Sequence, residues 1–161
     1  MARLSLLLFT ASLGLISGCM SASKLGNIFD AAKGFVLPEK QLEEITLSTT
    51  EDMNDQAPVA VDAVSVGSEE AVNVIGGLTA SQWFSQRDSI KTLYGSDILI
   101  SSWEITPSSR IEKQKIPKLT NPFVSTFIFV NYDNNSIKGY AVKDLSEITI
   151  ILKRNNFLIL Q

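Results

Sequence analysis

The second half of the chain alternates between short apolar runs and turn signals, and this pattern constrains the fold more than any other feature. After Gly95, runs rich in Val, Ile and Phe are separated by clusters of Asn, Asp, Ser and Pro. The most apolar run, Phe123–Tyr132, predicts a central strand. Arg110–Ile116 is mostly polar, which favours an edge position, because its lysines discourage pairing with other chains.

The first half adds two strands. Ile45–Ser48 alternates with period two, and Val59–Val66 is rich in Val, with valines that change face between Val61 and Val64. The change of face indicates either burial on both faces or a bulge. About seven or eight strands with one helical insertion predict a mainly β protein, a β-sandwich. The predicted strands are Ile45–Ser48, Val59–Val66, Ile98–Ile105, Arg110–Ile116, Phe123–Tyr132, Ile137–Val142, Glu147–Leu152 and Phe157–Leu160.

One stretch, residues 68–93, has helical signals, and they fall into two pieces. Ser68 is suited to cap a short helix, which Gly76 ends. Thr79 and Gln82 have the spacing of a capping box, so a second helix is predicted to begin after Thr79.

The second helix has an apolar face. Its members are Trp83, Ile90 and Tyr94, with Leu93 beside them. This spacing predicts that Trp83 packs against the sheet. Trp83, Phe84 and Trp103 are also consistent with an aromatic recognition surface, and core packing is the favoured interpretation.

The first 19 residues have the layout of a secretory signal peptide. Arg3 precedes the apolar run Leu4–Ile16, which is too short to span a bilayer as a helix. Residues 16–19, Ile-Ser-Gly-Cys, resemble the lipobox of bacterial lipoproteins. In those proteins the Cys thiol receives a diacylglycerol, the chain is cut before the Cys, and the new amino group is acylated as well.

The lipobox resemblance implies that Cys19 is the lipidation site. Three acyl chains make a stable membrane anchor. We therefore expect a signal peptide at residues 1–18, a lipidated tether at 19–43 and a β-sandwich domain at 44–161. Met20 follows the Cys, whereas lipoproteins kept in the inner membrane of enteric-type bacteria have Asp there. The resemblance thus implies an outer-membrane lipoprotein that faces the periplasm.

The composition excludes much enzyme chemistry and nucleic-acid binding. The chain has no His and one Cys, so a Ser-His-Asp triad and a Cys-cluster metal site are impossible. A Ser-Lys pair is chemically feasible, but no motif places one. With 14 Lys and Arg against 17 Asp and Glu, the formal net charge is −3, and no basic stripe exists to bind phosphates. We predict a protein that is not an enzyme, with no catalytic residues, cofactor or nucleic-acid partner.

A polar loop separates the first two predicted strands. Its residues are Glu51, Asp52, Met53, Asn54, Asp55 and Gln56. The carboxylates are of a type that binds Ca²⁺, but their spacing matches no EF-hand loop. A solvated loop is the favoured interpretation, and no metal site is predicted.

An ordered series of short motifs runs through the chain. The series is ITLS at 45–48, EDMND at 51–55, PVAV at 58–61, WF at 83–84, YGSDIL at 94–99 and EITPS at 104–108. Together with the lipobox and the chain length, this order resembles the TssJ family, the outer-membrane lipoprotein of the type VI secretion system. The resemblance covers roughly residues 45–160.

The resemblance implies a transthyretin-like β-sandwich with an added helical element. It also implies binding to the periplasmic domain of the inner-membrane protein TssM, through the loop between the first two strands. The partner-binding residues would then be Glu51–Gln56, with Met53 as an apolar anchor at the tip of the loop.

Two classes of function remain open at this stage. One is a structural subunit of a secretion envelope complex, and the other is a pilotin-like or small ligand-binding periplasmic lipoprotein. A buried pocket with convergent polar groups would favour ligand binding. A polar loop at the end of the sandwich would favour the structural subunit.

Overall fold

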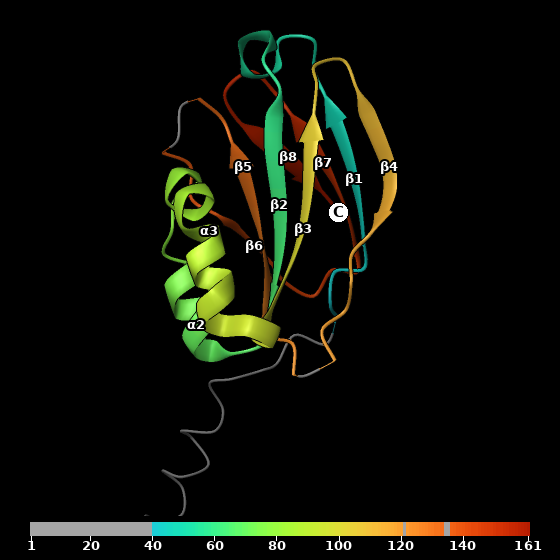
Figure 1. Ribbon diagram of the computed structural model, residues 1–161. Helices are drawn as coiled ribbons and strands as arrows, with labels where there is room; N and C mark the ends of the chain where they lie inside the picture. Colours follow the sequence, from blue (N-terminus) through green and yellow to red (C-terminus); the bar gives the residue numbers. More distant parts are fainter. Residues whose placement is uncertain (1–39, 121, 134–135) are drawn as a thin grey trace, which may run out of the picture. The chain divides into compact units, whose positions relative to one another are not determined.

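Eight strands form two four-stranded sheets in the part of the chain that the computed structural model describes, residues 40–120, 122–133 and 136–161. The strand orders are β4-β1-β7-β8 and β3-β2-β5-β6 (Figure 1). The bounds are β1 (Glu44–Thr49), β2 (Val59–Val66), β3 (Ile98–Ile105), β4 (Arg110–Lys115), β5 (Ser125–Asn131), β6 (Tyr140–Val142), β7 (Glu147–Leu152) and β8 (Phe157–Leu160). The predicted β-sandwich is confirmed.

Strand β2 is buried on both faces, which resolves the change of face in its valines. Its pairing with β3 and β5 runs without a register shift, so no bulge is present. Val59 and Val61 belong to the apolar core that also contains residues of β1 and β7, whereas Val64 and Val66 belong to a second core with residues of the helices. The valine-rich sequence of β2 therefore reflects burial on both faces of the strand.

The predicted positions of two other strands are also confirmed. β5 lies inside its sheet between β2 and β6, and β4 forms an edge of the other sheet. Next to β4 lies β1, which pairs antiparallel with β4 and parallel with β7. The sequence had not indicated the parallel pairing, because parallel partners are joined through distant parts of the chain.

Two helices cover one sheet on its outer face (Figure 1). Helix α2 (Glu69–Ile75) begins at Ser68, whose side chain accepts a hydrogen bond from the Ala71 N–H. Helix α3 (Ala80–Tyr94) begins with the predicted capping box of Thr79 and Gln82, in which both reciprocal hydrogen bonds form. Short 3-10 turns, η2 (Met53–Gln56) and η3 (Gly95–Asp97), complete the described elements.

Most of the predicted apolar face of α3 packs as expected. Trp83 is fully buried and Ile90 is 7% exposed, and both join the core beneath the helices. Leu93 is the exception, because it is 73% exposed at the last turn of α3. An aromatic recognition surface is not formed, since Trp83 is enclosed and Trp103 packs against the other core.

Residues just before β1 also contribute to the core. Leu42 is 1% exposed and belongs to the core between the sheets, and the Glu43 N–H donates to the Ser146 carbonyl at 2.8 Å. All described residues lie in one compact unit, and both cores are built from them. We therefore expect residues 40–161 to fold on their own. Cys19, the signal peptide and most of the predicted tether lie outside the described residues.

Candidate functional site

The loop between β1 and β2 lies at one end of the sandwich. The described chain starts at the opposite end (Figure 1). Strand β1 has six residues, so it separates Glu44 from this loop by roughly 20 Å. The loop is thus presented on the side of the domain away from the point at which the chain enters it.

The buried side chains in this loop correct one expectation. Met53 is fully buried and belongs to the core between the sheets, so it is not an exposed anchor. Asn54 is also buried, at 5% exposure. Four of the six predicted contact residues remain exposed, namely Glu51, Asp52, Asp55 and Gln56. The apolar Met53 side chain gains more from the core than from solvent, because its burial removes apolar surface from water.

Asn54 connects the loop to the neighbouring end of β5. Its side-chain oxygen accepts the Asp133 N–H at 3.1 Å, and its amide group donates to the Pro58 carbonyl at 3.4 Å. Its own N–H donates to the Arg154 carbonyl at 3.0 Å. Asn54 is therefore a positioning residue, since its buried side chain makes two of these hydrogen bonds and its backbone makes the third, which together fix the path of the loop.

The backbone reverses direction through three residues with left-handed φ values. These are Asn54 at 46°, Asp55 at 51° and Gln56 at 70°. Asn and Asp adopt this conformation more readily than other residues with a side chain. With this backbone conformation, Met53 lies in the core, whereas Asp55 and Gln56 are exposed to solvent.

The turn between β7 and β8 also holds the loop, which sequence reasoning missed. The Arg154 side chain pairs with Asp55 at 2.6 Å, and both side chains are more than half exposed. The Tyr132 hydroxyl donates to the Asn156 carbonyl in the same turn at 2.6 Å, and burial raises the pKa of Tyr132 to about 12. No sequence signal links these positions, because Asp55 and Arg154 are 99 residues apart.

The second polar cluster lies between α3 and β2. Asp62 is completely buried, and its Oδ2 accepts the indole N–H of Trp83 at 2.8 Å. The Arg87 guanidinium lies 3.4 Å from the same oxygen, and the other oxygen, Oδ1, has no hydrogen-bond partner among the described residues. The Trp83 ring stacks on Phe129 with centroids 5.0 Å apart. This cluster attaches α3 to the sheet. The one feature of the sequence that could have indicated it is Asp62, an acidic residue within the valine-rich run of β2.

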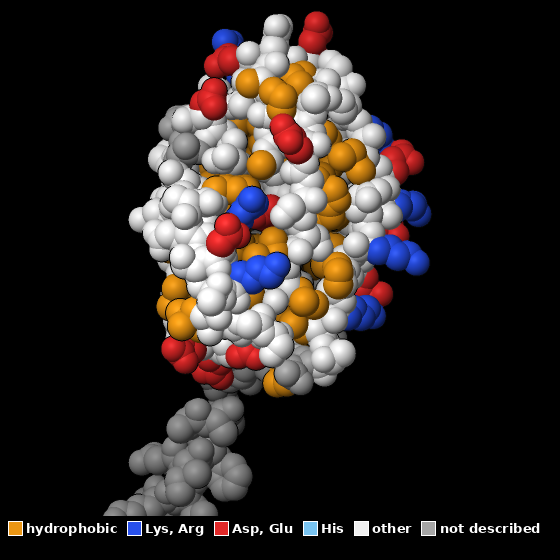
Figure 2. Space-filling model, in the orientation of Figure 1, with side chains coloured by type: hydrophobic (Ala, Val, Ile, Leu, Met, Phe, Trp, Pro, Cys, Tyr) orange, Lys and Arg blue, Asp and Glu red, His pale blue; other side chains and the backbone are white. Residues whose placement is uncertain are grey.

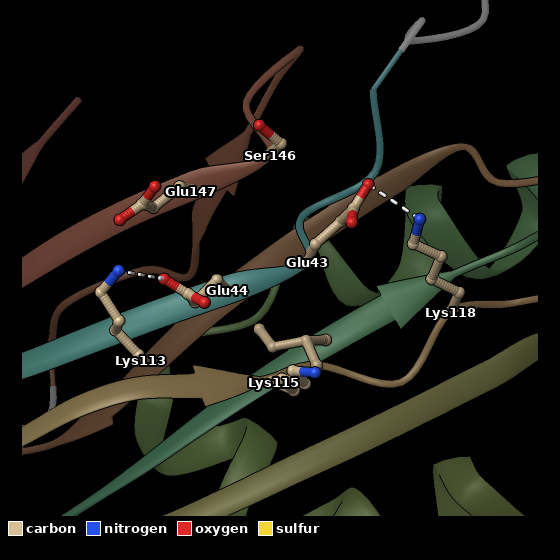
Figure 3. Close-up of a pocket in the computed structure, with 8 residues that line it drawn as sticks. Glu43, Glu44, Lys113, Lys115, Lys118, Ser146 and Glu147 are labelled. Carbon is tan, nitrogen blue, oxygen red and sulfur yellow. Dashed lines mark ion pairs between the residues drawn. The ribbon is translucent and has the colours of Figure 1, made fainter.

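A hollow lies at the end of the sandwich opposite the polar loop (Figure 3). Its lining is mostly charged, and two of its three lysines pair with two of its three glutamates. Lys118 lies 2.8 Å from Glu43, and Lys113 lies 4.0 Å from Glu44. Such an arrangement gives no support to a pocket for a small ligand, because ligand pockets are mostly apolar with a few polar groups, whereas this lining is mostly charged.

Two further findings concern the described residues only. No group of three or more Asp, Glu, Cys or His side chains is arranged to hold a metal ion in residues 40–120, 122–133 and 136–161. Within that same part of the chain, none of the helices combines the length and the apolar character needed to cross a membrane.

Comparison with solved structures relates this fold to type VI secretion lipoproteins. The chain superposes on Lip of Serratia marcescens, a membrane-bound component of the type VI secretion system, with a TM-score of 0.56 and 12% identity over 73% of this chain and 96% of Lip. For the lipoprotein TssJ1 of Pseudomonas aeruginosa the TM-score is 0.54 and the identity 13%, over 73% of this chain and 92% of TssJ1.

A chain from a structure of a type VI membrane complex gives a TM-score of 0.54 and 12% identity, with 75% of this chain and all of that chain covered. No protein-family model matches the sequence, and no curated protein matches it either. The fold is thus that of a TssJ-like β-sandwich, which agrees with the resemblance seen in the sequence.

Proposed function

We propose that this protein is a structural subunit, not an enzyme, of a type VI secretion envelope complex. It is a lipoprotein anchored in the outer membrane through Cys19, and its domain faces the periplasm. There it binds the periplasmic domain of a TssM-type inner-membrane protein through the loop between β1 and β2. The observation that carries the proposal is the shared fold with type VI secretion lipoproteins, joined to the lipobox of this chain.

The position of the loop supports this assignment. An anchor at Cys19 precedes the domain, and the chain enters the domain at the end opposite the loop (Figure 1). The exposed loop residues would therefore face away from the anchored end and toward a partner that comes from the inner membrane. A loop held by a rigid scaffold is well suited to binding, because its side chains lose little freedom on contact.

The charge of the loop indicates the chemistry of the partner surface. Glu51 and Asp52 are exposed and have no basic partner among the described residues, whereas Asp55 pairs with Arg154. Figure 2 shows acidic side chains at this end of the domain. Charges at the rim of an interface mainly change the association rate and its salt dependence. We infer that the contacting surface of the partner is basic.

A titration of residues 40–161 with the purified periplasmic domain of a TssM-type protein from the same bacterium tests the proposal. The variant Glu51→Lys with Asp52→Lys reverses two exposed charges and leaves Met53 and Asn54 in place. We expect its Kd to be at least tenfold higher, or about 1.4 kcal/mol. Replacing Met53 or Asn54 instead would unfold the loop and confuse binding with stability.

The matched control is Glu70→Lys with Asp88→Lys, which makes the same charge change on exposed positions of α2 and α3. Its affinity should equal that of the unmodified domain. Equal affinity for the loop variant and the control would place the interface elsewhere. If the unmodified domain does not bind at all, the TssM-type partner is wrong and the pilotin-like alternative becomes the better hypothesis.

A further inference from the structure

The two lateral sides of the sandwich differ in character. Strands β3 and β4 end the two sheets on one side and are joined by the short turn 106–109, so β6 and β8 end them on the other side. Among the described residues, five large hydrophobic side chains are exposed, and three of these lie on β6 and β8. They are Tyr140, Leu158 and Leu160. The β6 and β8 side is therefore the apolar one.

The edge strands of one sheet show the contrast most clearly. β4 carries Arg110, Glu112, Lys113 and Lys115, and Figure 2 shows basic and acidic side chains along this edge. Charges of this kind protect an edge from pairing with another chain. At the other edge, the run 155–161 around β8 contains no charged residue. The β8 edge lacks the protection that the β4 edge has.

The backbone of β8 presents hydrogen-bonding groups at this edge that no other strand of the described residues pairs with. The Lys153 N–H donates to the Asn156 carbonyl at 2.8 Å, and Leu158 lies opposite Ile151. In an antiparallel pair, bonded and non-bonded residue pairs alternate. Phe157 and Ile159 fall in the non-bonded positions, so their N–H and C=O groups point away from β7 toward the open edge.

We propose that β8 pairs antiparallel with β8 of a second copy of this chain about a two-fold axis. The pairing joins two four-stranded sheets into one of eight strands, in which Phe157 and Ile159 of each copy exchange backbone hydrogen bonds with the other. It also brings Leu158 and Leu160 of both copies together on the outer face, where each copy alone leaves them 44% and 50% exposed.

Charge favours a second copy in this orientation. Glu147 begins β7 and Lys153 follows its end, and the alternation of a strand puts both on the outer face. Glu147 and Lys153 lie at opposite ends of β7. When the two β8 strands pair antiparallel, the Lys153 end of one copy lies beside the Glu147 end of the other. A parallel pair would instead place the two Lys153 ends side by side. A two-fold axis places the same edge of both copies in contact. Because the run 155–161 contains no charged residue, this contact brings no like-charged side chains of the run together.

Sedimentation equilibrium of residues 40–161 between about 10 µM and 1 mM tests the proposal. A four-residue strand gives an interface smaller than the roughly 1,200 Å² of stable complexes, so we expect a Kd on the order of 100 µM. Leu158→Lys and Leu160→Lys, made separately, should each weaken association at least tenfold. The first sets two like charges opposite each other at the axis, and the second places a charge beside the leucines that the pairing brings together. Leu93→Lys is the matched control, because it changes an exposed leucine on α3 and should leave association unchanged.

Amide hydrogen exchange gives a second, site-specific measurement. As the concentration rises, the Phe157 and Ile159 amides should become protected, whereas the exposed amides of α3 should not. A domain that stays monomeric up to 1 mM overturns the proposal, and so does association that neither lysine variant weakens. Dimers that leave these two amides unprotected, or larger assemblies without a dimer, would also refute pairing through β8. The proposed pairing uses β8 and none of the exposed residues of the loop between β1 and β2, so either proposal can fail alone.

Discussion

Replacing Trp83 with Phe tests how the helices are attached to the sheet. The indole N–H is 2.8 Å from Asp62 Oδ2, inside a core where both side chains are fully buried. Phe keeps an aromatic ring to stack on Phe129 but removes this donor. The Asp62 carboxylate would then retain only Arg87, at 3.4 Å, as a partner among the described residues.

The expected cost follows from the kind of bond that is lost. A hydrogen bond to a charged group contributes about 1.5–3 kcal/mol to stability. A buried acceptor that loses its donor also keeps the full free-energy cost of its removal from water. We therefore expect Trp83→Phe to lower the free energy of unfolding by about 2 kcal/mol. Trp83→Ala also leaves a cavity, so its cost should be about 3–5 kcal/mol or more.

Urea unfolding of residues 40–161 measures both values, because the midpoint reports stability and the slope reports whether the exposed surface changed. A double-mutant cycle with Asp62→Leu isolates the hydrogen bond. Without the carboxylate, Trp83→Phe should cost about 1.5 kcal/mol less than it does in the unmodified domain. The same cost in both backgrounds, or a cost below about 0.5 kcal/mol for Trp83→Phe, would show that this hydrogen bond does not hold the helix in place.

Three shorter predictions concern other parts of the chain. Cys19→Ser should leave the protein without acyl chains and soluble, and recovery of this variant in the outer-membrane fraction would contradict the anchor. Burial raises the pKa of Tyr132 to about 12, above its value in the unfolded chain, so stability should be intact below pH 10 and fall as the pH rises toward 12. Tyr132→Phe should abolish that fall in thermal unfolding curves, and an unchanged fall would refute the assignment. Gly139→Ala should destabilise by about 1–3 kcal/mol, because the new Cβ would lie 2.5 Å from the Phe129 ring. Unchanged urea unfolding of this variant would show that the ring moves away at little cost.

Local physical chemistry, read from the sequence alone, was sufficient for most of the elements and for the starts of both helices. Ser68 and Thr79 cap helices because a side-chain oxygen satisfies an N–H within a few residues. The polar character of β4 indicated an edge, and the apolar run of β5 indicated an interior strand. β6 was predicted from Ile137 but is only Tyr140–Val142, because its length depends on contact with β5.

Only the tertiary structure decided which polar-loop residues are exposed. Met53 lies in a run of polar residues, and its sequence position could not show that the space between the sheets receives it. Asn54 and Asp55 are held by Asp133 and Arg154, which are distant in sequence and come close only when the strands pair. Pairing between distant segments depends on how the whole core fills, and no local pattern encodes it. For the same reason, the fold class could be predicted from the sequence, but the strand pairing and the surface offered to a partner could not.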